Sequence, residues 1–324
     1  MTVVPYKGVD IFNEDGTYRK EDDVVQGRSF SSNLSKLVKH MDKLENLQQG
    51  KPPSPVMAHI SLTNACNLTC SFCCFANRDI SEKMPTEKVF QALESFKAIG
   101  VTGVEFTGGG EPSIHPHFKE IVRYAKDLGF SLGICTNAAR FGLDRPIKKD
   151  IVELFDWVRM GMYGFYEGYD YDLRVFEGTN CKPSAAYVWD ENLETSKNPN
   201  IVGDWTDVKN KRILSKKFQT TENFIRMLDW VEENKIPCRI AFNAIKDVKE
   251  TAKDIETIRG IITEYEKDRG HKLQSAFLSD FNFKGERRND HCYMHMVKPF
   301  LFTDGYIYAC PSAELSIENN YNYV

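Results

Sequence analysis

The chain has 324 residues, which at about 150 residues per domain is enough for roughly two domains with a sizeable core. Hydrophobic residues make up 41% and charged residues 27%, values that exclude collagen-like, coiled-coil and largely disordered proteins. With 42 Lys and Arg against 46 Asp and Glu, the net charge of −4 provides no overall basic field for binding nucleic acids or anionic membranes.

The start of the chain and the cysteines bear on cellular location. The N-terminal residues lack the basic and then apolar pattern of an export signal, and no stretch reaches the ~18 apolar residues of a membrane span. Nine cysteines, an odd number in a long chain without an export signal, disfavour a disulfide framework. We therefore expect a cytoplasmic protein without membrane contact, whose clustered thiols form a metal or redox site.

Residues 1–55 are predicted to form an N-terminal extension. They are polar and charged, they contain one helical-period stretch around 30–47, and they end in a segment rich in Gly and Pro. This composition is typical of an appended arm or helix rather than an independent domain.

Residues 56–280 repeat a pattern of short apolar strand, turn residues and amphipathic helix. The pattern predicts strands at 56–62, 101–107, 130–136, 155–162, 236–242 and 272–278, and helices at 86–99, 116–128, 146–153, 219–234 and 249–268. Such alternation implies a parallel sheet. If the polar stretch 163–217 is an insertion, the rest fits six units of about 28 residues, too few for a full eight-unit barrel. A partial (β/α)6 barrel of the TIM type and a doubly wound sheet both fit this α/β pattern.

Cysteines are concentrated directly after the first predicted strand. Cys66, Cys70 and Cys73 have C-x3-C-x2-C spacing, and Cys74 follows. Three thiolates on a loop at the end of a strand can hold three irons of a [4Fe-4S] cluster and leave the fourth iron without a protein ligand. A structural zinc loop is the alternative, but it needs a fourth ligand, and Cys74 is poorly placed because it adjoins Cys73. The spacing therefore favours the cluster.

A glycine-rich loop, Gly108-Gly109-Gly110-Glu111-Pro112, follows the second predicted strand. Glycines let a ligand approach bare backbone and permit positive φ, and Pro112 stiffens the exit from the loop. Alone this is a weak signal, since many α/β turns contain glycine. Its position one βα unit after the cysteines favours a cofactor site.

In order and spacing, residues 56–279 resemble the radical S-adenosylmethionine (SAM) enzymes. The cysteine loop is similar to their CxxxCxΦC motif, with Phe72 at the aromatic position, and Gly109–Pro112 is similar to their GGEP loop. Thr136-Asn137-Ala138 resembles a TNG sequence at the end of strand three, and 157–162 resembles the WVRVSL form of strand four. Gly161 and Tyr163 depart from the serine and the acidic residue of that form, so roles assigned to those two family positions are not carried over.

The resemblance implies both a reaction and its site residues. SAM would bind the open iron of a [4Fe-4S] cluster held by Cys66, Cys70 and Cys73. An electron donor such as flavodoxin or ferredoxin would then drive cleavage of SAM to a 5′-deoxyadenosyl radical that abstracts hydrogen from the substrate. The implied cofactor-binding residues are Phe72, Gly108, Gly109, Gly110, Glu111, Asn137 and Arg159. For Asn137 and Arg159, strand-end hydrogen bonding or a salt bridge is an alternative of equal weight.

Residues 281–324 are predicted to form a twitch-like C-terminal segment with a β-hairpin. Cys292, Gly305 and Cys310 have the spacing that opens the SPASM and twitch subdomains, and Asp304-Gly305 is typical of a hairpin turn. Three interpretations stay open: Cys292 and Cys310 as ligands of a second iron-sulfur cluster, Cys310 as a catalytic thiol that donates a hydrogen atom, or two packed thiols. The other ligands of a second cluster would come from among Cys181, Cys238, His291 and His295.

The stretch 163–217 is far longer than the ~2 to 6 residues of an ordinary α/β loop. We expect it to cover the barrel mouth and contact the substrate, with Tyr163 as a catalytic candidate at the end of strand four. SPASM and twitch relatives often modify peptides or proteins, so the resemblance favours such a substrate narrowly over a nucleotide, a nucleic acid or a small molecule. A non-catalytic metal-binding module is the remaining alternative, but it would have no need of the glycine-rich loop.

Overall fold

The structure, a computed structural model, describes residues 40–51, 54–70, 72–73, 75, 79–162, 171–189, 212–213, 220–242, 248–278 and 297–308. Helix α3 (Met41–Gln48) comes first. Its Lys43 Nζ donates to the carbonyl oxygens of Pro55 at 2.8 Å and Gly100 at 2.6 Å, which ties the helix to the segments that enter the first two sheet strands. The remainder of the predicted N-terminal extension, 1–39, lies outside the described residues.

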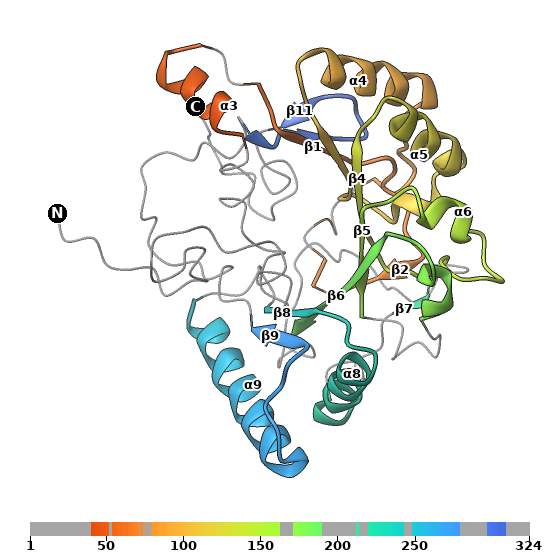
Figure 1. The fold of residues 1–324 in the computed structure, drawn as a ribbon. Coiled ribbons are helices and arrows are strands. Elements are labelled where there is room, and N and C mark those ends of the chain that lie inside the picture. Colours follow the sequence, from red (N-terminus) through yellow and green to blue (C-terminus); the bar gives the residue numbers. More distant parts are fainter. Residues whose placement is uncertain are drawn as a thin grey trace.

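A curved sheet of nine strands forms the body of the protein (Figure 1). In chain order the strands are β1 (Met57–Ile60), β3 (Gly103–Phe106), β4 (Ser131–Thr136), β5 (Trp157–Gly161), β6 (Lys182–Trp189), β8 (Cys238–Phe242), β9 (Ala276–Leu278), β10 (Phe300–Leu301) and β11 (Ile307–Tyr308). Their spatial order is β11-β10-β1-β3-β4-β5-β6-β8-β9, and every pair except β10 and β11 is parallel. Strands β9 and β11 are its two edges, so the sheet is an open, partial barrel.

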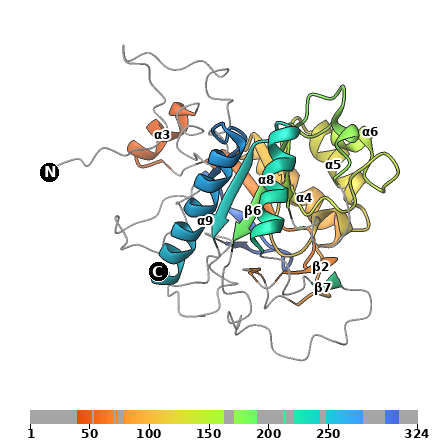
Figure 2. The ribbon, with the colours of Figure 1, turned by 90° about the horizontal axis from the view of Figure 1, so that it is seen from below.

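The helices cover the outer side of this sheet (Figures 1 and 2). They are α4 (Thr86–Ala98), α5 (Phe118–Asp127), α6 (Lys149–Val152), α8 (Thr221–Glu233) and α9 (Val248–Arg269). The strand residues that pack beneath them are large, apolar and buried: Val104, Phe106, Leu132, Ile134, Val158, Met160, Tyr187 and Ile240. Burial of each such side chain contributes about 1.5–3 kcal/mol, and together they form the core. Among the described helices, none is both long and apolar enough to cross a membrane.

Helices on one side of an open sheet confirm the partial barrel and not the doubly wound alternative. All six predicted strands and all five predicted helices are present, with ends displaced by a few residues. The prediction that 163–217 is an insertion is wrong in part, because β6 lies within it and pairs with both β5 and β8. Apart from the C-terminal hairpin, the described sheet therefore has seven parallel strands rather than six. Ser184 and Ala186 occupy alternate positions of β6, so its hydrophobic alternation is weak.

The C-terminal hairpin matches its prediction. Strands β10 and β11 are antiparallel, Phe302 N donates to the carbonyl of Tyr306 at 3.0 Å, and Gly305 has φ of +88°. Tyr306 N donates to Asp304 Oδ1 at 2.8 Å, which fixes the turn. Because β10 pairs in parallel with β1, the hairpin extends the barrel sheet at its first strand.

Candidate functional site

The cysteine loop, defined as residues 66–73, follows the carboxyl end of β1. Cys66, Cys70 and Cys73 are half-buried and are thiols rather than disulfides. A short strand inside the loop, β2 (Leu68–Thr69), pairs in parallel with β7 (Arg212–Ile213). The 163–217 stretch therefore reaches the cysteine loop at 212–213, and the expectation that it covers the barrel mouth stays a prediction.

The chemistry of the donor set suits an iron-sulfur cluster. Three half-buried thiols on one short loop are the ligands that such a cluster takes from protein, and cluster assembly and loop conformation are coupled because the bound thiolates fix the loop. Within the part of the chain that the structure describes, no three His, Cys, Asp or Glu side chains converge closely enough to hold a metal ion. The loop therefore carries the right ligands without a preformed metal geometry. Cys74 lies outside the described residues, so its predicted lack of a ligand role stays a prediction.

The glycine loop, defined as residues 108–112, lies directly against the segment that leads into Cys66. Gly110 N donates to the carbonyl of Thr63 at 2.7 Å, and Glu111 N donates to the carbonyl of Ala65 at 2.8 Å. A Cβ atom at Gly110 would overlap the backbone of Ala65. Gly110 was predicted to let a ligand come close to the backbone. In the structure, the backbone of Ala65, in the segment that leads into the cysteine loop, lies against Gly110 instead.

Glu111 joins the glycine loop to the end of β4. Its buried carboxylate accepts hydrogen bonds from Ser113 N at 3.2 Å, Ser113 Oγ at 2.7 Å, Thr136 Oγ1 at 2.6 Å and Asn137 N at 2.8 Å. Burial raises the pKa of Glu111, and these four hydrogen bonds oppose that rise only in part. Because every one of these donors is neutral, Glu111 holds two loops together without a counter-ion.

Asn137 extends this connection to the cysteine loop. Its Nδ2 donates to Asn67 Oδ1 at 2.7 Å and lies 3.9 Å from Cys66 Sγ. The next residue, Ala138, has φ of +59°, a left-handed conformation that favours glycine. This explains physically why the TNG sequence that it resembles has glycine there. The structure thus brings Glu111 and Asn137 together with the cysteine loop, and their role in cofactor binding stays a prediction.

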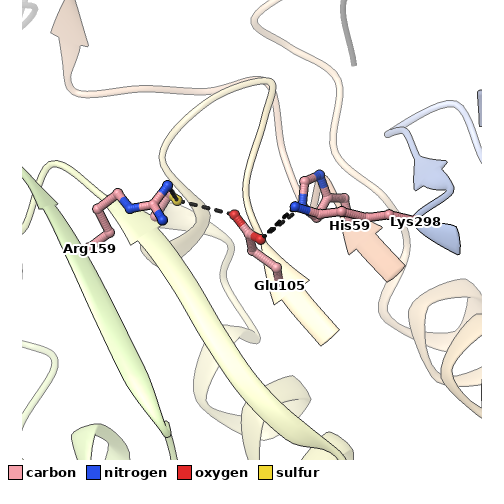
Figure 3. Close-up of polar contacts among 5 residues, drawn as sticks. His59, Glu105, Arg159 and Lys298 are labelled. Atoms are coloured by element: carbon pink, nitrogen blue, oxygen red, sulfur yellow. Dashed lines mark hydrogen bonds and ion pairs between the residues drawn. The ribbon is translucent and has the colours of Figure 1, made fainter. Parts of the chain in front are cut away.

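A second group of polar side chains lies inside the barrel (Figure 3). Glu105 on β3 is buried, and its Oε2 lies 2.8 Å from His59 Nε2 and 3.2 Å from Lys298 Nζ. Cys135 Sγ on β4 donates to Glu105 Oε1 at 3.3 Å, and Arg159 Nη1 on β5 lies 3.9 Å from the same sulfur. We call these five residues the interior charge cluster.

The interior charge cluster keeps the carboxylate of Glu105 charged inside the barrel. Burial alone would raise the pKa of Glu105, but His59, Lys298 and Arg159 hold it well below the usual range. Burial and the neighbouring Glu105 raise the pKa of Cys135 to about 11, so this residue stays a thiol. The charge of Arg159 acts on Glu105, while its side chain contacts Cys135 and the Trp157 ring, so both its salt bridge and its contact with SAM stay predictions.

Most of the interior charge cluster was not predicted from the sequence. The available signal was a charged or polar residue between buried apolar ones, as His59 is in the strand MAHI and Glu105 in GVEF. Lys298 had no such signal, because only the pairing of β10 with β1 brings it to Glu105.

Other site residues from the sequence analysis fall in two groups. Phe72 is half-buried on the cysteine loop, where it was expected. Tyr163, Cys292, Cys310, His291 and His295 lie outside the described residues. Cys181 directly precedes β6 and Cys238 is the first residue of β8. Both are buried at the amino-terminal ends of the strands, opposite the two loops, so they are badly placed as ligands of a cluster near the barrel mouth.

Comparisons with known proteins agree with this arrangement. Residues 60–168 match the family model of the radical SAM superfamily. An S-adenosylmethionine-dependent nucleotide dehydratase from Selenomonas ruminantium is 33% identical over 98 residues, which are 30% of this chain and 35% of that protein. The sporulation killing factor maturation protein SkfB of Bacillus subtilis is 33% identical over 84 residues, which are 26% of this chain and 20% of that protein. The match thus spans about a third or less of these curated relatives.

Similarity to a solved structure extends over more of the chain. The crystal structure of Streptococcus suis SuiB bound to precursor peptide SuiA superposes with a TM-score of 0.54 and 17% identity, covering 90% of this chain and 67% of that one. At this identity the comparison establishes the fold, a partial TIM-type barrel. The family match covers the cysteine loop, the glycine loop and strands β3, β4 and β5.

Proposed function

We propose that this protein is a radical SAM enzyme in which Cys66, Cys70 and Cys73 hold a [4Fe-4S] cluster and SAM binds between the cysteine loop and the glycine loop. The observation that carries the proposal is the contact between these loops, through the hydrogen bonds of Gly110 and Glu111 to the entry segment of the cysteine loop. When bound, the cluster and SAM together supply a carbon radical that removes a hydrogen atom from the substrate. The cluster needs thiols that stay reduced, a condition that the cytoplasm meets.

The chain's own residues orient and enclose the cofactors in this proposal. Asn137, fixed by Glu111, holds the start of the cysteine loop through Asn67. Phe72 offers an aromatic face to the adenine, and the glycine loop offers backbone groups to the methionine end of SAM. Arg212–Ile213 pairs with the cysteine loop and so lies beside the proposed site.

We propose a peptide or protein side chain as the substrate, and a flavodoxin or ferredoxin as the electron donor. Support for the peptide comes from SuiB, whose structure contains a precursor peptide, and from SkfB, named as a maturation protein of a killing factor. A nucleotide is the second candidate, supported by the nucleotide dehydratase relative. Product analysis separates the two: incubation with nucleoside triphosphates yields a modified nucleotide only in the second case.

The proposed chemistry is tested by anaerobic reconstitution with iron and sulfide. We expect about four irons per chain for one cluster, or about eight if a second cluster is present, and formation of 5′-deoxyadenosine from SAM with a reductant. Cys70→Ala should abolish 5′-deoxyadenosine formation because its thiolate has no substitute. Cys181→Ala is the matched control and should behave like the unaltered protein. It changes a buried cysteine at the amino-terminal end of β6, far from the two loops. Full iron content and activity in Cys70→Ala would refute the proposal.

A further inference from the structure

The C-terminal hairpin, defined as residues 300–308, lies beside the segment that leads into the cysteine loop. We call that segment, residues 61–65, the entry segment. Its first residue, Ser61, donates its backbone N–H to the carbonyl of Leu301 at 2.9 Å. Because β1 lies between β10 and β3 in the sheet, the entry segment continues between the hairpin and the glycine loop. The hairpin is therefore a direct neighbour of the proposed cofactor site.

A single carboxylate links the hairpin to the entry segment. Glu82 Oε2 accepts hydrogen bonds from Asn64 Nδ2 at 3.0 Å and from Thr303 Oγ1 at 3.2 Å. The Glu82 backbone also takes part, because its carbonyl accepts from Asn64 N at 2.9 Å. Asn64 and Thr303 are both buried, and hydrogen bonds to a charged acceptor are stronger than neutral ones. The start of the cysteine loop is thus bound to the hairpin turn through Glu82.

Aromatic rings link the hairpin to the exit from the cysteine loop, where Phe75 follows two residues after Cys73. The ring of Phe75 stacks on that of Phe302, with centroids 6.5 Å apart and planes 10° apart. The centroid of the Phe300 ring lies 6.3 Å from that of Phe75. Phe300 and Phe302 are buried, and aromatic pairs at such distances attract each other beyond the effect of burial alone. The hairpin therefore contacts the cysteine loop beyond its last thiol as well as before its first.

The hairpin also reaches the glycine loop. Gly108 has φ of +84°, and a Cβ atom at this position would lie 2.6 Å from Phe300 Cζ. The Phe300 ring thus occupies the space that a side chain at position 108 would need. One hairpin therefore contacts both loops of the proposed cofactor site.

We propose that the C-terminal hairpin positions the cysteine loop for its cluster. Thr303, through Glu82, fixes where the loop begins, and Phe302, through Phe75, fixes where it ends. Both are positioning residues, because they act through the flanks of the loop. With its two ends held, the loop loses less conformational freedom when its thiols bind metal. The inference rests on the proposed function for the group that is bound.

Hydrogen exchange of the iron-free, full-length protein tests the contact itself. Thr303→Val removes the hydroxyl and keeps the shape of the side chain, so the amides of Asn64 and Ala65 should exchange about tenfold faster. Thr303→Ser keeps the hydroxyl and should preserve the protection. The matched control is Thr102→Val, which removes a hydroxyl bond of 3.1 Å to the Val56 carbonyl at the amino-terminal end of the strands. It should leave exchange of the entry segment unchanged.

Iron release from the reconstituted protein to a chelator tests the consequence for the cluster. If iron leaves when the cysteine loop opens locally, the release rate follows the opening equilibrium. Thr303→Val should then release iron about tenfold faster and Phe302→Leu about threefold faster, the factors expected for one charge-assisted hydrogen bond and one aromatic pair. Thr303→Ser should match the unaltered protein. Ile307→Val, which changes a side chain 60% exposed on the same hairpin, should match it too.

Two results would overturn the inference. One is unchanged exchange of the entry segment in Thr303→Val. The other is iron release at the unaltered rate in both Thr303→Val and Phe302→Leu. Failure of the proposed function has a different signature, because the unaltered protein would then take up no cluster. That result would also refute the role of the hairpin toward a cluster, while the exchange experiment would still decide whether the hairpin holds the entry segment.

Discussion

The two loops at the barrel mouth are built in opposite ways. The glycine loop is tied to two neighbouring segments, and the buried carboxylate of Glu111 accepts four hydrogen bonds from Ser113, Thr136 and Asn137. The cysteine loop has half-buried thiols and no preformed metal geometry among the described residues. We therefore expect that protein contacts alone form the glycine-loop half of the proposed cofactor site, while metal binding completes the conformation of the cysteine loop, which protein contacts hold at Asn67 and at the β2–β7 pairing.

Removal of the Glu111 carboxylate should have the largest effect on stability. Glu111→Ala leaves buried donors of Ser113, Thr136 and Asn137 without an acceptor, and we expect a loss of about 3–5 kcal/mol in the free energy of unfolding. Urea unfolding of the iron-free protein measures this loss. Glu120→Ala, an exposed glutamate on α5, is the control and should change stability by less than about 0.5 kcal/mol. A small loss in Glu111→Ala would show that the glycine loop is not held as described.

Gly110→Ala should be the next most damaging change. The added Cβ overlaps the Ala65 backbone, which cannot move aside as a flexible side chain can, so we expect a loss of about 1–3 kcal/mol. Because Ala65 adjoins Cys66, this variant should also lower the iron content after reconstitution. Gly260→Ala on α9, where an added Cβ meets nothing within 4 Å, serves as the control and should be neutral or slightly stabilising. Normal iron content in Gly110→Ala would show that a change in the glycine loop does not disturb the cysteine loop.

Ala138→Gly should stabilise the protein. Ala138 has φ of +59°, a conformation that costs an alanine about 1 kcal/mol relative to glycine. Thermal unfolding should therefore show a rise in Tm of several degrees at most, with cluster content unchanged. A drop in Tm would mean that the greater flexibility of glycine outweighs the relieved strain.

Cys70→Ala should have the smallest effect on the iron-free protein. Its thiol is half-buried on a loop without preformed metal geometry, so we expect a change in unfolding free energy of less than about 0.5 kcal/mol. The same change should remove the stabilisation that reconstitution adds to the unaltered protein. A large loss of stability without iron would show that the cysteine loop is fixed by protein contacts alone.

Local sequence patterns predicted much of this architecture because the spacing of apolar residues reflects which side chains are buried. Strands such as SLGICT carry alternating or continuous apolar residues, and the Asp304-Gly305 turn carries its own backbone preference, so both were found. Strand β6 was missed because its inward positions hold small residues such as Ser184. The interior charge cluster was missed because sheet pairing assembles it from residues as distant as His59 and Lys298. Cysteine spacing marked the proposed metal ligands, but their neighbours Asn67 and Thr63 emerged only from loop contacts.

Hydrogen-deuterium exchange of the two loops, measured anaerobically on the iron-free and reconstituted protein, tests the central claim most directly. The glycine loop should be protected to the same extent in both states, because its hydrogen bonds to Thr63 and Ala65 need no metal. The cysteine loop should exchange rapidly without iron and slowly after reconstitution. Equal protection of the cysteine loop in both states, or a gain of protection in the glycine loop alone, would contradict the claim that one half of the site is preformed and the other is completed by metal.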